Sequence, residues 1–288
     1  MSYNRFMEKI LSSLNTLGSK LHYHHTLTSS KEASYIYGPE SHSQLEILYL
    51  LSDGIEYVID GEHYTVNRGD AIVVLPHEIH SIVIKDNLNY ERMVFMIDLD
   101  SICKLISDKY ELIGLFAPQV KGKRVLPRKV VEQSRLKELF ISISKQDASE
   151  IHYGLTSASK MIEILIELDK LLSSNEVEFI HPDSIDSLTI AVIKYLNEHI
   201  SDTLNLSDIA KKFFVSKSTL CHKFKKSMNM TLNEYYTIKK IKYAEELIKN
   251  GVSANEASFK LGYNNYLTFY YNYKRITGKS PSQSKYEK

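Results

Sequence analysis

The sequence predicts an α+β chain of two domains, a β-rich domain followed by helices and then an all-α domain. Short apolar segments rich in Ile, Val and Tyr recur between residues 35 and 97, with turn residues between them, which is typical of strands. Helical periodicity follows over residues 101–175 and returns from residue 184. The last hundred residues repeat one helical pattern twice. A chain of 288 residues is long enough for two domains with ordinary cores.

The strands are expected between clear turn signals. Asp60-Gly61 is the strong signal for a two-residue hairpin. Residues 67–70 supply the next turn, and Pro76 ends the strand after it. Short strands at near-regular spacing predict a small sandwich or barrel. The predicted strands are Glu46–Leu51, Ile55–Ile59, Tyr64–Val66, Ala71–Leu75, Ser81–Ile84 and Met93–Ile97.

The helical segment that follows contains a heptad-like seam. Its members are Ala158, Met161, Leu165, Leu168 and Leu172. Such a seam pairs with its copy in a homodimer, or it packs on the sheet of its own chain. Both alternatives stay open at this stage. We place the first domain at residues 1–175, a linker at 176–183, and the second domain at 184–288.

The second domain contains two short amphipathic helices, each followed by a tight turn and a helix with a basic end. The first unit spans residues 206–226 and the second spans residues 253–275. Between them, Thr231 to Glu234 is a capping-box pattern that opens a long helix, and Asn250-Gly251 ends that helix near Lys249. This is the outline of two helix-turn-helix units joined by a long helix.

Charge is divided unevenly between the domains. Residues 184–288 contain 17 Lys and Arg against 9 Asp and Glu, whereas the rest of the chain contains 19 against 26. A basic helical part on an acidic remainder indicates a nucleic-acid-binding module attached to something else.

The remaining composition indicates a cytoplasmic protein without a membrane span. Cys103 and Cys221 show no metal-ligand spacing, which favours a reducing compartment. The N-terminus lacks a signal-peptide core. No run of about 18 apolar residues exists.

The C-terminal hundred residues resemble the DNA-binding domain of AraC/XylS-family transcription regulators. The matching segments are Leu206–Ala210, Val215–Leu220, Phe224–Lys226, Lys240-Ile241 with Ala244 and Leu247, Leu261–Tyr263, Phe269, and Tyr273–Arg275 through Gly278–Pro281. The resemblance implies a regulator, expected to be an activator, with double-stranded DNA and RNA polymerase as partners. The long helix would hold two reading helices against adjacent major-groove segments, about 34 Å apart.

The resemblance also implies which side chains contact DNA. Ser218, His222, Leu267, Tyr270 and Tyr271 fall at base-facing positions. The family often has Arg at the positions of His222 and Tyr271. Because Arg is the usual reader of guanine, we expect a site that leans toward A·T. The full expected set is Lys217, Ser218, Thr219, His222, Lys223, Lys225, Leu267, Thr268, Tyr270, Tyr271 and Lys274.

The strand region resembles the cupin-like sensor domain attached to many members of this family. The matching segments are His42 with Glu46-Ile47, Gly54, Gly61, Gly69-Asp70, Pro76 with His80, and Tyr90–Arg92. The resemblance implies a cupin-like β-barrel that binds a small molecule, often a sugar, inside its mouth, so we expect His42, Glu46, His80 and Tyr49 to bind a ligand.

His42, Glu46 and His80 also resemble part of a cupin metal site, in which Glu40 takes the place of the first histidine. We favour polar ligand contact over a metal and expect no cofactor. The His22–His25 cluster is expected to be a surface loop. Tyr37, Tyr57 and Tyr64 could stack on a sugar, and more simply fill the strands.

Together these features predict a ligand-responsive transcription regulator and not an enzyme. Two alternatives remain. A metal-dependent cupin enzyme would need a complete metal shell. A regulator without a small-molecule ligand would respond to a protein partner.

Overall fold

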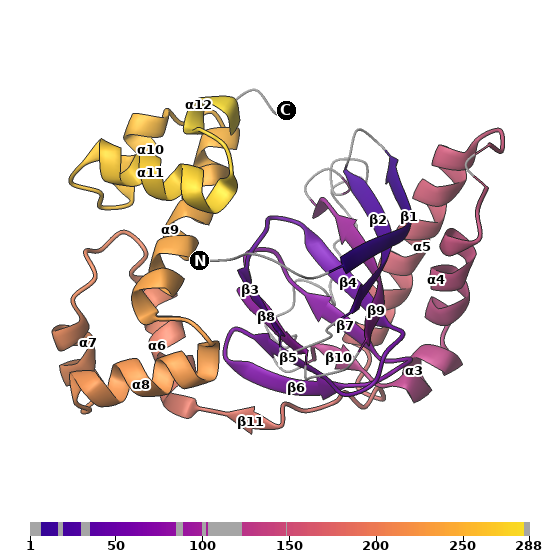
Figure 1. Cartoon of the computed structure of the whole chain (residues 1–288), viewed down its shortest axis with the longest axis horizontal. Coiled ribbons are helices and arrows are strands. Elements are labelled where there is room, and N and C mark those ends of the chain that lie inside the picture. The colour runs from indigo at the N-terminus through magenta and orange to yellow at the C-terminus, as the bar shows by residue number, and fades with distance from the viewer. Residues whose placement is uncertain are drawn as a thin grey trace.

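The computed structural model describes residues 7–16, 20–29, 35–84, 89–99, 102, 123–147 and 149–284. Its N-terminal part, here the sheet domain, contains two antiparallel sheets that face each other (Figure 1). The larger has the strand order β1-β2-β9-β4-β7-β10, and the smaller has the order β11-β6-β5-β8-β3. The β-rich first domain is confirmed, and the closure of its two sheets into a cupin-like barrel stays a prediction.

The strands of the sheet domain follow in chain order, with these bounds: β1 Met7–Thr16, β2 Leu21–Ser29, β3 Tyr35–Glu40, β4 Leu45–Leu50, β5 Ile55–Ile59, β6 Glu62–Val66, β7 Ala71–Val74, β8 His80–Ile84, β9 Asn89–Ile97, β10 Val125–Leu126 and β11 Ser184–Ile185. The six predicted strands all occur, most with shifted ends. Asp60 and Gly61 both have positive φ, 42° and 90°, as a tight hairpin between twisted strands requires.

The large sheet is buried on both faces, and strand alternation separates the two sides. On β4, Leu48 and Leu50 point between the sheets, whereas Leu45, Ile47 and Tyr49 point to the helices that cover the outer face. These helices are α3 (Arg128–Gln133), α4 (Leu136–Ser144) and α5 (Tyr153–Ser173).

The heptad-like seam lies on α5 and packs inside its own chain. All five of its residues are buried in the core between α5 and the large sheet. Of the two alternatives, the structure therefore supports packing within the chain. Three other apolar residues of this region are exposed: Ile151, Leu155 and Ile166.

The predicted linker at 176–183 is packed against the sheet domain. Phe179 is buried in the core under the helices, and Ile180 forms a bridge with Val125. Directly afterwards β11 pairs with β6 at the edge of the smaller sheet. The first helix of the next domain therefore starts from a fixed strand.

The C-terminal part, here the helical domain, contains α6 (Ser187–Glu198), α7 (Leu206–Lys212), α8 (Lys217–Met228), α9 (Leu232–Lys249), α10 (Ala254–Lys260), α11 (Tyr266–Thr277) and α12 (Pro281–Ser284). The capping box predicted for the long helix is present, because Thr231 and Glu234 exchange both hydrogen bonds. The helix ends at Lys249, and Gly251 follows with φ 95°. The two helix-turn-helix units, α7–α8 and α10–α11, have separate cores, and α9 contributes to both.

Two further predictions can be placed. The His22–His25 cluster is not a surface loop, because it lies in β2 between β1 and β9. Cys221 is a free cysteine, whereas Cys103 lies outside the described residues.

Among the described helices, none is long and apolar enough to cross a membrane.

Candidate effector pocket and nucleic-acid interface

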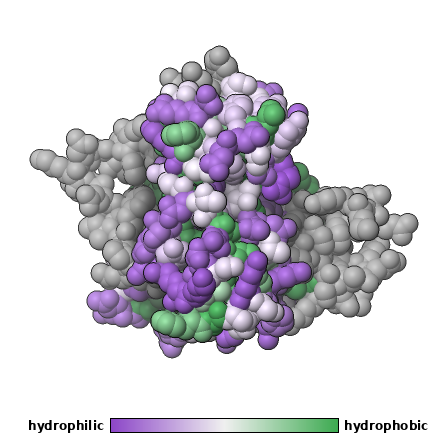
Figure 2. Space-filling model, turned by 90° about the vertical axis from the view of Figure 1, so that its left-hand side faces the viewer, coloured by the Kyte–Doolittle hydropathy of each residue, from purple (hydrophilic) through white to green (hydrophobic). Residues whose placement is uncertain are grey.

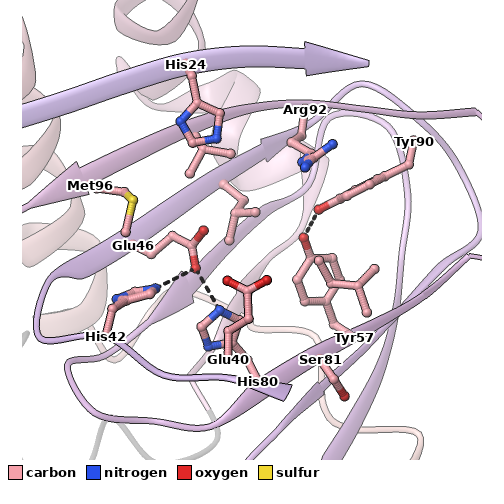
Figure 3. Close-up of a pocket in the computed structure, with 13 residues that line it drawn as sticks. His24, Glu40, His42, Glu46, Tyr57, His80, Ser81, Tyr90, Arg92 and Met96 are labelled. Atoms are coloured by element: carbon pink, nitrogen blue, oxygen red, sulfur yellow. Dashed lines mark hydrogen bonds and ion pairs between the residues drawn. The ribbon is translucent and has the colours of Figure 1, made fainter. Parts of the chain in front are cut away.

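A polar cavity of about 230 Å³ lies between the two sheets. It is lined from β2, β9 and β4 on one side and from β3, β5 and β8 on the other (Figure 3). The lining residues are His24, Glu40, His42, Glu46, Leu48, Tyr57, His80, Ser81, Ile82, Tyr90, Arg92, Val94 and Met96. The volume of the cavity is smaller than the roughly 300–1,000 Å³ of pockets that bind drug-sized ligands. The cavity therefore suits a small metabolite.

Three of the four predicted ligand-binding residues meet in this cavity. Glu46 Oε2 lies 3.3 Å from His42 Nε2 and 3.2 Å from His80 Nε2. In each ring the other nitrogen faces a backbone carbonyl, Gln44 O at 2.9 Å and Glu78 O at 3.3 Å. A ring that donates at both nitrogens is the protonated imidazolium, so His80 and Glu46 can form a buried ion pair.

Burial and hydrogen bonding act in opposite directions on this cluster. Burial alone would raise the pKa of the Glu46 carboxyl, but hydrogen bonds from His42 and His80 outweigh burial and hold that pKa well below its usual range. Burial alone would lower the pKa of His80, but its contact with the Glu46 carboxylate raises that pKa to about 8.

The raised pKa of His80 predicts a pH-dependent stability. The ion pair stabilises the fold fully below pH 6.5, the unfolded value, and this contribution is lost as the pH rises through about 8. We expect the free energy of unfolding to fall by about 2 kcal/mol between pH 6 and 9. In Glu46→Gln this contribution from His80 should vanish, as measured by urea unfolding across the pH range, and only the smaller fall from Glu78 should remain, because burial raises the pKa of Glu78 to about 7.

Glu91→Gln is the matched control for this experiment. It removes a His–Glu contact of 2.8 Å, between His25 and Glu91, that lies outside the cavity. This variant should keep the wild-type pH dependence. An unchanged pH dependence in Glu46→Gln would contradict the ion pair.

The same cluster could hold a metal. Among the described residues, the ligand atoms of His42, Glu46 and His80 all lie within 4.8 Å of one another. Two imidazoles and a carboxylate suit Zn, Fe or Mn, and the backbone carbonyls behind the rings would orient them as ligands. Glu40, at the position of the first cupin histidine, also lines the cavity.

Tyr49 does not join this group. It lies on the opposite face of β4 and stacks on Phe140, with ring centroids 5.0 Å apart. Other residues take part instead. Arg92 is buried and donates to Thr28 Oγ1 at 2.8 Å, and the hydroxyls of Tyr57 and Tyr90 contact each other. With carboxylate acceptors and cationic donors side by side, the cavity can bind a molecule rich in hydroxyl groups.

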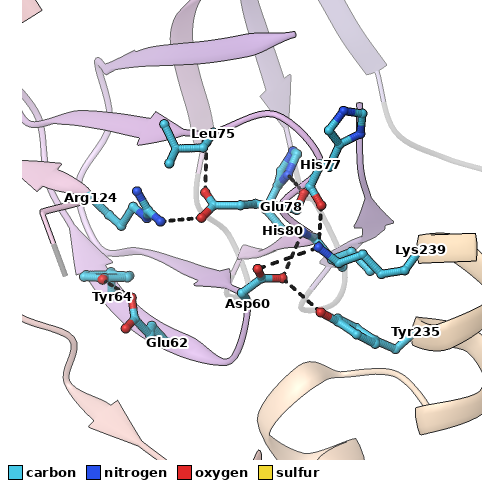
Figure 4. A network of polar contacts seen from close by, with 11 residues as sticks. Asp60, Glu62, Tyr64, Leu75, His77, Glu78, His80, Arg124, Tyr235 and Lys239 are labelled. Carbon is cyan, nitrogen blue, oxygen red and sulfur yellow. Dashed lines mark hydrogen bonds and ion pairs between the residues drawn. The ribbon is translucent and has the colours of Figure 1, made fainter. Parts of the chain in front are cut away.

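The loop that brings His80 into the cavity also contacts the helical domain. Ile79 is 1 % exposed and belongs to the core formed by α6, α7, α8 and α9. Asp60 accepts from Ile79 N at 3.1 Å and from the Tyr235 hydroxyl at 3.5 Å, and Lys239 Nζ lies 3.8 Å from its other oxygen (Figure 4). The pocket and the helical domain therefore share one loop.

Further contacts hold the two domains together. Lys239 donates to His77 O at 2.5 Å, and His63 Nε2 contacts Ser227 O at 2.7 Å. A Cβ added at Gly61 would meet Met228 Sδ at 3.3 Å, so the hairpin turn lies directly against α8. Glu78 stabilises the shared loop from inside, because it accepts from Leu75 N at 2.8 Å and contacts Arg124 (Figure 4).

The predicted DNA-contacting residues lie on α8 and α11, the second helix of each unit. The helical domain forms the left side of Figure 1, and the face of it that Figure 2 shows has many hydrophilic side chains, with intermediate and apolar ones between them. The exposed members are Lys217, Ser218, Thr219, His222, Lys223, Lys225, Leu267, Thr268, Tyr271 and Lys274; Tyr270 is half-buried. Lys223 also pairs with Asp186 at 3.7 Å. Local capping fixes where both helices begin, because the side chains of Ser216 and Asn265 accept from Thr219 N and Leu267 N.

Fold and sites together define a class of protein, a DNA-binding transcription regulator with an attached ligand-binding domain. Comparisons agree. Residues 209–285 match a helix-turn-helix domain family, and residues 22–162 match the AraC-like ligand-binding domain. The chain belongs to the AraC family of transcription regulators.

Three relatives illustrate the similarity. The Msm operon regulatory protein of Streptococcus mutans is 32% identical over 146 residues, which cover 48% of this chain and 52% of that protein. The Bacillus subtilis HTH-type transcriptional regulator YbfI is 26% identical over 204 residues, 70% of each chain. The Escherichia coli HTH-type transcriptional activator RhaS is 21% identical over 230 residues, which cover 78% of this chain and 79% of that protein. The chain thus spans about half the length of the first of these relatives.

Proposed function

We propose that this protein is a transcription activator controlled by a small hydroxyl-rich molecule, a carbohydrate, bound between its two sheets. The observation that carries the proposal is the loop shared by the pocket and the helical domain. His80 lines the cavity, and its neighbour Ile79 is buried among the helices. A ligand that contacts His80 acts one residue away from the DNA-binding domain.

Such a ligand works as a switch only if it binds two arrangements of the domains with different affinity. The contacts at Asp60 provide an element that can differ between the arrangements. They tie the shared loop to Tyr235 and Lys239 on α9, the helix that contributes to the cores of both helix-turn-helix units. A shift of the loop would therefore reach both reading helices.

The proposal includes partners. The regulator acts in the cytoplasm as a homodimer and contacts RNA polymerase at its promoter. Because the α5 seam is buried within the chain, we place the dimer contact on the exposed apolar residues Ile151, Leu155 and Ile166. Activation agrees with RhaS, a transcriptional activator.

The second candidate is metal-assisted chemistry, favoured by the geometry of His42, Glu46 and His80. Elemental analysis of the purified chain separates the two. Stoichiometric Zn, Fe or Mn that is lost in His80→Ala would favour the metal. A protein that contains no metal and binds a sugar would favour a regulator that works without a metal.

A thermal-shift screen with monosaccharides and sugar acids tests the proposed function. A ligand at about 100 times its Kd stabilises the folded state enough to raise Tm by roughly 5–10 °C. We expect this shift to disappear in Arg92→Met, which removes a lining guanidinium, and to persist in Tyr49→Phe, which changes a residue outside the cavity. The same ligand should change the affinity for promoter DNA. A screen without any stabilising sugar would instead favour control by a protein partner.

A further inference from the structure

The two helix-turn-helix units are built alike, so their reading helices can be compared position by position. Both α8 and α11 have 12 residues. Their fourth positions, Leu220 and Phe269, are buried, and each helix ends at a left-handed residue, Asn229 or Gly278. The turn before each helix also contains a left-handed residue, Phe214 or Gly262. Equivalent positions therefore face equivalent directions.

The faces that equivalent positions present to solvent differ in chemistry. On α8, positions one, two and six are Lys217, Ser218 and His222, all exposed. On α11 the same positions are Tyr266, Leu267 and Tyr271, with exposed fractions of 39%, 61% and 68%. One unit thus exposes polar and cationic groups where the other exposes an apolar and aromatic surface.

The basic end is the same in both helices. Positions nine and ten are Lys225 and Lys226 on α8, and Lys274 and Arg275 on α11; all four are exposed. Cations at these positions can neutralise phosphates, which position a helix without reading sequence. The charge of α11 therefore fits the same polyanionic partner as α8, and only the base-facing chemistry differs.

Base edges distinguish between these two kinds of face. The N-terminal residues of a reading helix contact the bases in the major groove. Hydrogen-bonding side chains recognise the polar edges of guanine, adenine and cytosine, whereas apolar side chains recognise the methyl group of thymine. Leu267 carries no side-chain donor or acceptor, so thymine methyl is the base feature that it can recognise.

We propose that the two units read by different chemistry. α8 reads its segment by hydrogen bonds, and α11 reads thymine methyl groups through Leu267 and Tyr271. The operator is then asymmetric, with thymines concentrated in the segment under α11. This inference rests on the proposed DNA-binding function and adds the base chemistry that each unit recognises.

Replacing thymine by uracil tests it, because uracil lacks only the methyl group. A binding site is first selected by the full chain from random duplex DNA, and each thymine is then replaced in turn. Loss of one buried methyl should weaken binding about fourfold. We expect this loss at thymines of one segment only. In Leu267→Ala it should disappear at the thymine that Leu267 contacts, because the apolar contact is already missing, and it should remain at a thymine that Tyr271 contacts.

Ser218→Ala is the matched control, because Ser218 occupies on α8 the position of Leu267 on α11. This variant should keep the sensitivity to uracil. Circular dichroism checks that both variants fold, as their exposed positions lead us to expect. Equal affinity for thymine and uracil sites, or the same loss in Leu267→Ala as in wild type, would overturn the inference while leaving DNA binding intact. A chain that selects no sequence would overturn the proposed function and this inference together.

Discussion

Leu165→Glu is expected to unfold the sheet domain. Leu165 is 1 % exposed, in the core between α5 and the large sheet. The substitution removes a buried leucine and places a carboxylate in an apolar core, which together cost about 4–5 kcal/mol. Because that is close to the whole stability of many domains, we expect loss of the folded signal in circular dichroism or a strongly lowered urea midpoint.

Ile166→Glu is the matched control, one residue further along the same helix. Ile166 is 46% exposed, so the same substitution should change the stability by no more than about 0.5 kcal/mol. If the exposed side of α5 forms the proposed dimer contact, this variant should be a folded monomer in light scattering. A folded Leu165→Glu monomer obtained from a wild-type dimer would instead show that the seam lies between two chains.

Ile79→Asp is expected to separate the two domains. Ile79 reaches from the sheet domain into the core of the helical domain. A carboxylate at this position would lose its hydration among apolar and aromatic side chains such as Val192, Leu196 and Tyr235. We expect wild type to unfold in one thermal transition and the variant in two, because the domains no longer stabilise each other. In allosteric proteins a ligand commonly changes the affinity at the second site 5- to 150-fold. In Ile79→Asp the ligand should no longer change the affinity for DNA.

Val83→Asp controls for a new charge nearby, on the strand that directly follows Ile79. Val83 lies on β8, is half-buried, and belongs to none of the apolar cores of the described residues. It should keep both the single transition and the response to ligand. Retention of the ligand response in Ile79→Asp would mean that the signal travels by another route.

The regular elements could be predicted where their patterns were local. The strands β4 to β9 follow from apolar runs and turn residues, and the capping box at Thr231 marks the start of α9. β2 was not predicted, because its only strongly buried apolar residues on the helix side, Leu21 and Tyr23, lie among histidines. Its strand conformation depends on pairing with β1 and β9, which no local pattern reveals.

The candidate site could also be predicted only in part. The resemblance to a known motif identifies His42, Glu46 and His80. Tyr49 was assigned to the same site, although strand alternation contains the signal against it. Residues an odd number apart on a strand face opposite sides, so Tyr49 cannot share a face with Glu46. Arg92 lies in a segment that resembles the sensor domain, but its place in the cavity could not be predicted, because that place depends on the pairing of β9 with β4.

The edge pairing of β11 has a consequence for recombining regulators. A fusion point inside residues 176–183 that precedes Phe179 would carry Phe179 and the bridge at Ile180 away from the sheet domain that they complete. It would also leave β6 as an unprotected edge strand, open to pairing with other chains. Exchange of sensor domains by gene fusion should therefore cut after Ile185, and the incoming sensor must supply its own counterparts of Asp60 and Ile79 for the hybrid to respond.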